Sequence, residues 1–156
     1  MAAELDIELT VNGDPVRATV APAELLIDFL RERLALTSVK RSCDVQVCGT
    51  CTVLVDGGVV SSCTYLAVEA DGRSVLTVEG FAQSAEFAQF EQAFVRHAAL
   101  QCGYCTPGLL LTLKSLRDAG ELSSEEQIRH GLDGNVCRCT GYRSILKAAR
   151  ELAGLS

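Results

Sequence analysis

The chain has 156 residues, of which 48% are hydrophobic and 22% charged, a composition typical of a globular protein. Its 20 acidic residues outnumber its 14 basic residues, which gives a formal net charge of −6, and tryptophan is absent. Such a chain lacks the cationic surface and the aromatic residues that binding to nucleic acid or to an anionic membrane requires.

The first 80 residues show the pattern of short strands around one helix. Apolar and polar residues alternate over 4–11 and again after the turn signal at 12–14, which predicts a β-hairpin. Apolar residues then recur at helical spacing over 26–34, so a helix should follow. A second hairpin is predicted over 52–60. Two further extended runs are expected, at 65–68 and 74–78.

Beyond residue 80 the apolar spacing becomes helical. We predict four helices, over 87–97, 109–116, 123–131 and 142–152. Thr106 is placed to cap the second helix, with Pro107 in its first turn, and Ser123 with Glu126 forms a candidate capping box for the third. The sequence therefore predicts an α+β fold with two domains, an α+β domain over 1–80 and an all-α domain over 81–156.

All eight cysteines fall into two groups of four. Four residues separate the first two cysteines of the first group and two separate the next, which is the spacing of plant-type ferredoxin loops around a 2Fe-2S cluster. Gly49 has no side chain and lets this loop approach a cluster closely. The members of the first group are Cys43, Cys48, Cys51 and Cys63.

The second group consists of two close pairs on the helical half, Cys102 with Cys105 and Cys137 with Cys139. Only one residue separates the last pair, which is unusual for zinc sites. Both pairs precede predicted helix starts, where backbone amides and the positive end of the helix dipole stabilise thiolates. The second group therefore indicates another site for four thiolates.

Other uses of the cysteines fit the pattern less well. Two zinc sites would use the same ligands and stay an alternative. Cys102 and Cys105 alone resemble a thiol–disulfide exchange motif, but they lack its βαβ context. A Rieske centre needs two histidines, and His97 and His130 lie outside both groups.

The start of the chain and its hydropathy bear on its compartment. Acidic residues over 4–8 do not match a secretory signal, and the sequence has no apolar run of roughly eighteen residues that could span a membrane. We therefore expect a cytoplasmic protein, in which cysteines serve as metal ligands or redox groups rather than disulfides.

The motifs together resemble the small iron–sulfur subunit of the xanthine oxidase family of molybdenum hydroxylases. The resemblance covers roughly residues 5 to 153, and its most specific parts are the last two motifs. It implies a β-grasp plant-type ferredoxin domain followed by a four-helix domain, each with one 2Fe-2S cluster held by four cysteines. The motifs that carry it are 43–57, 62–63, 76–80, 101–108 and 135–142.

The resemblance also implies partners and a role. A large molybdopterin-binding subunit and a medium FAD-binding subunit would join this chain, commonly as a dimer of heterotrimers. Electrons would run from the molybdopterin site through the helical-domain cluster and then the β-grasp cluster to FAD. Gln101 and Cys139 match residues that contact the molybdopterin cofactor, although Gln101 could equally be a local partner of the backbone. No catalytic residue is expected on this chain.

Two other functions stay open at the level of the sequence: a stand-alone 2Fe-2S redox carrier and a zinc-stabilised interaction module. The substrate of the complex is equally open among an aldehyde, an N-heterocycle, carbon monoxide and other compounds, because no substrate contact is expected on this chain. One segment departs from the family pattern. Many members carry glycines inside the first cysteine loop, where this chain has the residues Asp44, Val45, Gln46 and Val47.

Overall fold

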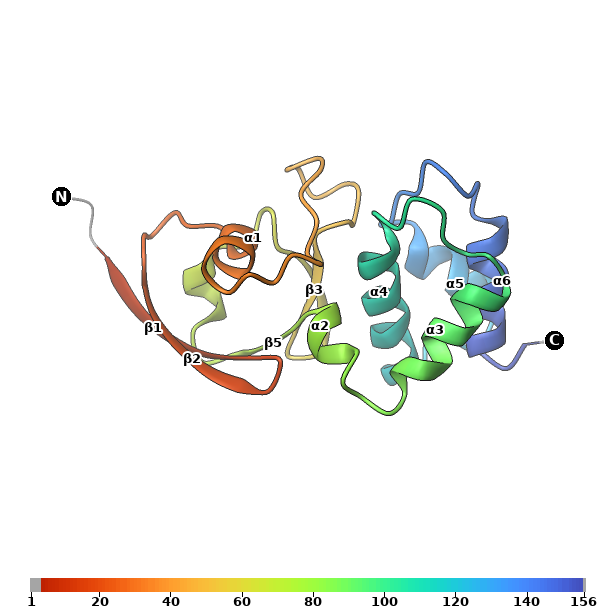
Figure 1. Ribbon diagram of the computed structural model, residues 1–156, viewed down its shortest axis with the longest axis horizontal. Helices are drawn as coiled ribbons and strands as arrows, with labels where there is room; N and C mark the ends of the chain where they lie inside the picture. Colours follow the sequence, from red (N-terminus) through yellow and green to blue (C-terminus); the bar gives the residue numbers. More distant parts are fainter. Residues whose placement is uncertain (1–3, 156) are drawn as a thin grey trace.

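A five-stranded mixed sheet forms the N-terminal half of the chain in the computed structural model, which describes residues 4–155 (Figure 1). The spatial order of the strands is β2-β1-β5-β3-β4. β1 and β5 run parallel, and the other neighbours run antiparallel. Both predicted hairpins are confirmed. The strands are β1 (Leu5–Val11), β2 (Asp14–Val20), β3 (Thr52–Val55), β4 (Gly58–Ser61) and β5 (Ser74–Leu76).

The predicted helix after Pro22 is present but short and irregular. It begins as α1 (Leu26–Asp28) and continues as π-helical turns in η1 (Phe29–Arg33). Its apolar side chains are fully buried and pack into one hydrophobic cluster with the sheet residues Ile7, Leu9 and Val53. This covering segment leads directly into the first cysteine loop.

The prediction of an extended run at 65–68 is wrong for most of that segment. Residues Ala67–Ala70 form a 3-10 helix, η2, and only Leu66 makes an isolated bridge, with Leu25. The two alanines that this turn buries are three residues apart, which suits a 3-10 helix rather than a strand. Glu69 stabilises the turn, since its carboxylate accepts a hydrogen bond from the Leu66 amide at 2.9 Å.

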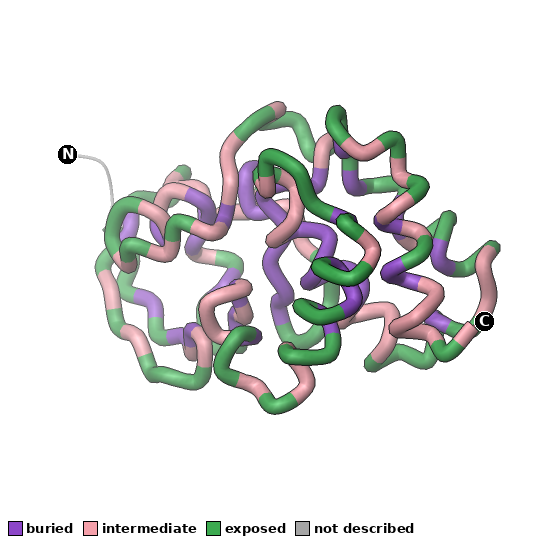
Figure 2. The backbone as a smooth tube through the Cα atoms, turned by 45° about the vertical axis from the view of Figure 1, so that its right-hand side comes forward, coloured by how far each residue is buried: buried purple, intermediate pink, exposed green. Residues whose placement is uncertain are grey.

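The C-terminal half is helical, as predicted, and the four predicted helices are preceded by a short one that begins at Val78, inside the extended run predicted over 74–78. Phe81, Phe90 and Phe94 are buried at its centre, and the Phe81 and Phe90 rings meet edge to face with centroids 5.0 Å apart. Leu54 of β3 belongs to the same cluster, so the helical half packs directly on the sheet (Figures 1 and 2). The helices are α2 (Val78–Phe81), α3 (Phe87–Arg96), α4 (Thr106–Asp118), α5 (Glu125–Leu132) and α6 (Arg143–Leu152).

The helix starts differ from the predicted ones in detail. Thr106 is the first residue of α4 and does not cap it, since its hydroxyl is buried without a hydrogen-bond partner among the described residues. The cap of α5 lies one residue later than predicted, at Ser124, whose side chain accepts from the Gln127 amide at 3.2 Å. Both cap predictions were wrong because several adjacent residues could each start the helix.

Candidate metal centres

The first cysteine loop connects η1 to β3 and lies at the edge of the sheet nearest the helices (Figure 1). The amides of Val47 and Cys48 both donate to the Cys43 sulfur, at 3.4 Å each. Backbone donation to this sulfur, chiefly from Val45, lowers the pKa of Cys43 to about 6. The loop is therefore shaped to stabilise a thiolate at Cys43.

The other half of the first group is buried under the loop. Cys51 at the start of β3 and Cys63 after β4 are both buried, and their thiols interact. The Ser62 hydroxyl joins the two segments by donating to the Cys51 carbonyl at 2.7 Å. Burial raises the pKa of Cys51 to about 11, so in the metal-free chain this thiol keeps its proton at neutral pH.

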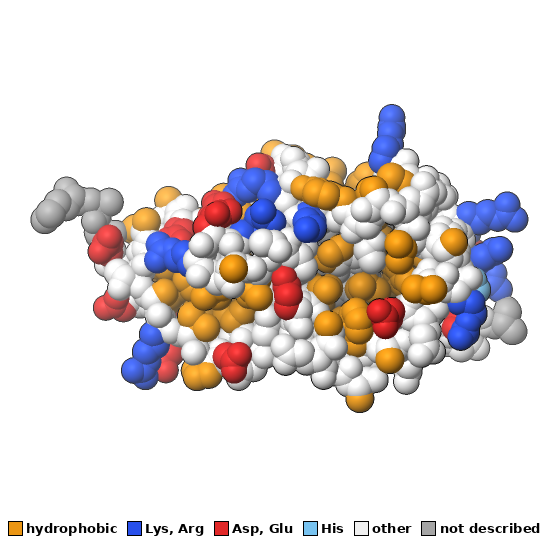
Figure 3. Space-filling model, in the orientation of Figure 1, with side chains coloured by type: hydrophobic (Ala, Val, Ile, Leu, Met, Phe, Trp, Pro, Cys, Tyr) orange, Lys and Arg blue, Asp and Glu red, His pale blue; other side chains and the backbone are white. Residues whose placement is uncertain are grey.

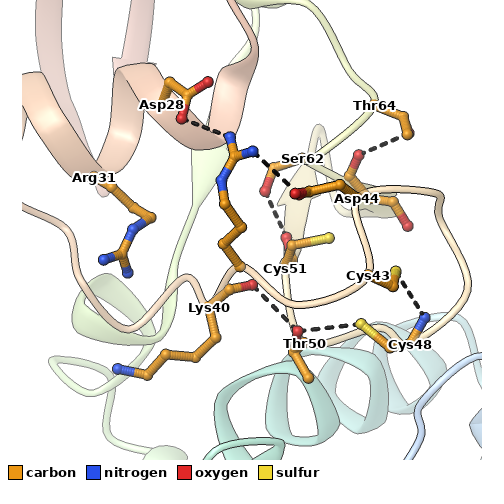
Figure 4. A network of polar contacts seen from close by, with 12 residues as sticks. Asp28, Arg31, Lys40, Cys43, Asp44, Cys48, Thr50, Cys51, Ser62 and Thr64 are labelled. Atoms are coloured by element: carbon orange, nitrogen blue, oxygen red, sulfur yellow. Dashed lines mark hydrogen bonds and ion pairs between the residues drawn. The ribbon is translucent and has the colours of Figure 1, made fainter.

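Side chains hold the segment 44–47 of this loop in place. Asp44 and Gln46 both adopt left-handed backbone conformations, with φ of 55° and 58°. Asp28 and Asp44 face the same guanidinium, that of Arg41, at 2.6 and 3.2 Å (Figure 4). The Thr64 hydroxyl donates to Gln46 at 3.2 Å. These polar contacts hold a backbone conformation that non-glycine residues seldom adopt.

The second group comes together from two loops of the helical half. The sulfurs of Cys102 and Cys139 lie 3.6 Å apart, and the thiols of Cys105 and Cys137 interact. Burial raises the pKa of Cys105 to about 12. At Cys137 burial acts the same way, but hydrogen bonds from Thr140, whose hydroxyl lies 3.2 Å from the sulfur, outweigh it and lower the pKa.

Each group of four thus divides into two neighbouring pairs. Cys43 contacts Cys48, and Cys51 contacts Cys63; Cys102 contacts Cys139, and Cys105 contacts Cys137. Among residues 4–155, no three His, Cys, Asp or Glu side chains gather as ligands of one metal ion. A 2Fe-2S cluster has two irons and takes two thiolates on each, so paired thiols fit its ligand requirement.

Gln101 and Cys139, which itself belongs to the second group, lie together on the surface. Both are exposed, and Gln101 Nε2 donates to the Cys139 carbonyl at 3.2 Å. The two histidines lie elsewhere, as expected. His97 contacts Glu151 at 2.7 Å, and the side chain of His130 is 90% exposed.

The two groups are joined by contacts that the sequence did not reveal. The Val136 amide donates to the Cys48 carbonyl at 2.8 Å, and Asn135 Nδ2 donates to the Gly49 carbonyl at 3.2 Å. The Tyr104 hydroxyl donates to the Arg41 carbonyl at 2.5 Å. The cysteine loops accordingly lie along one side of the molecule, at the top of Figure 1. Asn135 is the first residue of the motif 135–142, but nothing in that motif indicates its contact with Gly49.

Apolar side chains are exposed around both groups. Val45 and Val47 on the first loop are 64% and 61% exposed. Near the second group, Leu100, Tyr104 and Val136 are also exposed. Figure 3 shows hydrophobic side chains along this side of the molecule and over the helical half. Apolar surface of this kind marks contact with other proteins.

Two family models match the chain over adjacent ranges. One describes a 2Fe-2S iron–sulfur cluster binding domain and matches residues 9–77, and the other describes a 2Fe-2S binding domain and matches residues 77–150. No helix within residues 4–155 has the length and apolar character needed to cross a membrane. The division into domains at residue 80 stays a prediction.

Curated proteins and solved structures are similar to nearly the whole chain. The nicotine 6-hydroxylase small subunit of Paenarthrobacter nicotinovorans is 42% identical over 96% of this chain and 90% of its own. The xanthine dehydrogenase iron-sulfur-binding subunit of Escherichia coli O157:H7 is 42% identical over 94% of this chain and 93% of its own. A chain of quinoline 2-oxidoreductase from Pseudomonas putida 86 superposes with a TM-score of 0.89 at 43% identity, covering 96% of this chain and 93% of that one.

Proposed function

The chain belongs to the iron–sulfur subunits of the xanthine oxidase family of molybdenum hydroxylases, and we propose that its two cysteine groups each hold one 2Fe-2S cluster. It is an electron-transfer subunit of an oxidoreductase complex, in which partner subunits bind the molybdopterin cofactor and FAD. The proposed ligands of the first cluster are Cys43, Cys48, Cys51 and Cys63. Those of the second are Cys102, Cys105, Cys137 and Cys139.

The pairing of the thiols is the observation that supports this assignment most strongly. In the first group, Cys43 and Cys48 would hold one iron, and Cys51 and Cys63 the other. When bound, each cluster accepts and releases one electron. The chain's own residues bind it, exclude water from its inner side, and donate hydrogen bonds to its sulfurs, which raise its reduction potential.

The partners in this proposal are a large molybdopterin-binding subunit and a medium FAD-binding subunit, arranged as a dimer of heterotrimers. The exposed apolar residues beside both cysteine groups support the presence of partners, since they would be covered on assembly. The compartment would be the cytoplasm, where a reducing environment keeps the eight free thiols available for metal.

The proposed order of electron transfer starts at the molybdopterin cofactor, passes the helical-domain cluster and then the first-domain cluster, and ends at FAD. Gln101 and Cys139 would meet the molybdopterin cofactor, which their exposure and mutual contact support. The Gln101 carboxamide has a second hydrogen besides the one it gives to the Cys139 carbonyl, and this hydrogen is available to a ligand.

Rapid mixing of a Cys51→Ser complex with substrate tests this order. The variant should lose the first-domain cluster, while substrate still reduces the helical-domain cluster. Flavin reduction should slow drastically because the intermediate carrier is missing. Iron content is measured in the same sample, since serine could retain a cluster with an altered potential. A Val59→Ser complex, changed at an exposed position of β4, serves as the control. Flavin reduction at the normal rate with the cluster absent would show that the order is wrong.

A further inference from the structure

A cavity of about 740 Å³ lies between α5 and α6, and no cysteine lines it. Its apolar lining consists of Leu132, Tyr142 and Leu146. Four basic and two acidic residues also line it and give it a formal charge of +2, whereas the whole chain has −6. The basic residues are Arg129, Arg143, Lys147 and Arg150, and the acidic ones are Glu125 and Asp133.

Two of these basic side chains share the carboxylate of Glu125, which lies 2.6 Å from Arg129 and 3.4 Å from Arg150. Within residues 4–155, the structure gives no ion pair or hydrogen bond to the side chains of Arg143 and Lys147. These two residues lie four apart on α6 and therefore on one face of the helix, where like charges repel each other. The cavity thus carries positive charge that no ion pair in the described part of the chain neutralises.

The positive surface continues across α6 into a second cavity of about 580 Å³. The two cavities share the side chains of Lys147 and Arg150, and the second extends past Glu151 to His97, just after α3. We call the two cavities together the basic groove. Figure 3 shows basic side chains gathered at this C-terminal end of the molecule. Because the groove is long and its cations Arg143 and Lys147 are exposed, it suits a polypeptide segment better than a small anion, which a binding pocket mostly encloses.

The wall of the groove that Tyr142 forms is fixed before any partner binds. Its hydroxyl accepts a hydrogen bond from the Cys137 amide at 3.0 Å and donates one to the Asn135 carbonyl at 2.9 Å. Leu132, on the α5 side, is only 3% exposed. A preformed site loses less free energy to the ordering of its own side chains when a partner binds.

We propose that the basic groove binds an acidic segment of a partner protein, whose carboxylates lie against Arg143 and Lys147. An apolar side chain of this segment enters between Leu132 and Leu146. Charge complementarity identifies the occupant, because its carboxylates supply the missing counter-charges and relieve the repulsion between the two cations.

The charge of the groove also indicates how long the partner stays bound. The subunits proposed above would cover the exposed apolar residues beside the cysteine groups, whereas the groove exposes no large apolar side chain. Permanent interfaces are the more apolar ones, so the charged groove suits a partner that binds transiently. This inference goes beyond the electron-transfer role and does not depend on the ligands assigned to either cluster.

The first test measures the binding of a fluorescent peptide of Glu-Glu-Leu repeats to the purified, cluster-loaded chain by anisotropy. The unmodified chain should bind this peptide, with an affinity that falls as salt is raised, and should not bind a peptide of Gln-Gln-Leu repeats. Lys147→Glu should weaken binding at least about tenfold. Arg17→Glu, the same change of charge at a side chain on β2 that is 81% exposed, should weaken binding less than about twofold. Equal losses in the two variants, or no binding by the unmodified chain, would overturn the proposal.

Thermal melts separate docking from a structural role of Lys147. Lys147→Gln should weaken peptide binding without lowering Tm, because the ammonium group that it removes is repelled by Arg143. A lower Tm with unchanged peptide binding would overturn the proposal, since Lys147 would then serve the fold.

Competition and assembly distinguish the proposed partner from other occupants. Inorganic phosphate should displace the peptide no better than chloride at equal ionic strength; stronger displacement would show a small-anion site and overturn the proposal. The assembled complex should bind the peptide as tightly as the isolated chain does. Loss of binding on assembly would contradict a transient partner, because a subunit of the complex would then cover the groove.

Discussion

Glu79 is a partly buried carboxylate that ties the segment after η1 to the start of α2. It accepts hydrogen bonds from the Ser38 amide at 2.9 Å, from the Ser38 hydroxyl, and from the Thr77 hydroxyl at 2.5 Å. Burial disfavours its charged form, but these donors outweigh burial and hold the pKa of the Glu79 carboxyl below its usual value. The ionised carboxylate therefore stabilises the fold.

Replacement of Glu79 by Gln should lower the free energy of unfolding by about 1–2 kcal/mol at neutral pH, because charge-assisted hydrogen bonds are lost. A carboxyl whose folded-state pKa is depressed contributes stability that is lost only as pH falls through that pKa. The difference between Glu79→Gln and the unmodified chain should therefore stay constant from pH 8 down to about pH 5.5. Denaturant titrations of the cluster-loaded chain measure it. A difference that fades within this range would show that the pKa of the Glu79 carboxyl is raised rather than lowered, and so contradict this account.

Thr140 and Thr50 both lie beside a cysteine sulfur, but their hydroxyl hydrogens go to different acceptors. The Thr140 hydroxyl donates to the Cys137 sulfur at 3.2 Å. Thr50 lies 3.3 Å from the Cys48 sulfur, yet its hydroxyl donates to the Lys40 carbonyl at 3.2 Å (Figure 4). Donation to a ligand sulfur raises the reduction potential of a cluster.

Thr140→Val should therefore lower the potential of the helical-domain cluster, by on the order of tens of mV, and leave the first-domain cluster unchanged. Thr50→Val serves as the matched control and should shift the first-domain cluster less. Redox titrations that follow the two cluster signals separately measure both potentials. A larger shift in Thr50→Val than in Thr140→Val would contradict this account of the two hydroxyls.

Gly49 and Gly57 have similar backbone angles but different surroundings. Their alanine variants therefore distinguish the cost of a strained backbone from the cost of a steric clash. Gly49 and Gly57 have φ of 67° and 84°, but a Cβ on Gly57 would meet no atom within 4 Å. Gly57→Ala should cost about 1 kcal/mol, or roughly 2–4 °C in Tm, through its left-handed backbone alone. Gly49→Ala should cost about 3 kcal/mol because it also collides with the Gly134 carbonyl. Equal decreases of Tm in the two variants would show that the Gly134 carbonyl moves away from the new Cβ at no measurable cost.

At the scale of elements, each half of the chain combines helices or strands with one cysteine group. The two ligand loops of the helical half lie at opposite ends of a long sequence interval, before α4 and before α6. A metal that joins them links the helices that follow, so metal binding and folding should be coupled.

Cys137→Ser should remove the helical-domain cluster and lower both helicity and Tm, while the first-domain cluster stays bound. Iron analysis of the purified chain should fall to half, and circular dichroism follows the helices. Cys51→Ser is the complementary variant, in which the same loss of iron should leave the helices intact. Unchanged helicity and Tm in Cys137→Ser, with its cluster demonstrably lost, would mean that packing alone holds the helices.

Regular elements with strong local signals were predictable from the sequence. The hairpins over β1–β2 and β3–β4 combine strict alternation with a turn signal, and the aromatic face of α3 has clear helical spacing. The 3-10 helix at Ala67–Ala70 was missed because a short apolar run has no distinctive period. The start of α5 was misplaced by one residue because Ser123 and Ser124 can both cap a helix.

The cysteine groups were predictable, whereas the contacts between them were not. Spacing assigns four sulfurs to each group but does not say which two face each other. The contacts of Asn135 with Gly49 and of Tyr104 with Arg41 join residues far apart in sequence, and no local pattern encodes them. Arg41 likewise has no motif, although it holds the left-handed residue Asp44.

At the scale of the whole molecule, the sheet half and the helical half form one elongated body with all cysteine loops along one side (Figure 1). The buried core continues from the sheet into the helices through Leu54, so the halves are packed rather than merely tethered (Figure 2). This arrangement brings the two cysteine groups close together, as the proposed transfer of electrons between their clusters requires.

Iron and labile-sulfide analysis of the purified, intact chain tests the central claim most directly. Eight thiolates in two groups of four should hold four irons and four sulfides per chain, with two distinct spin signals after reduction. Zinc in place of iron, or a single 2Fe-2S cluster per intact chain, would contradict it.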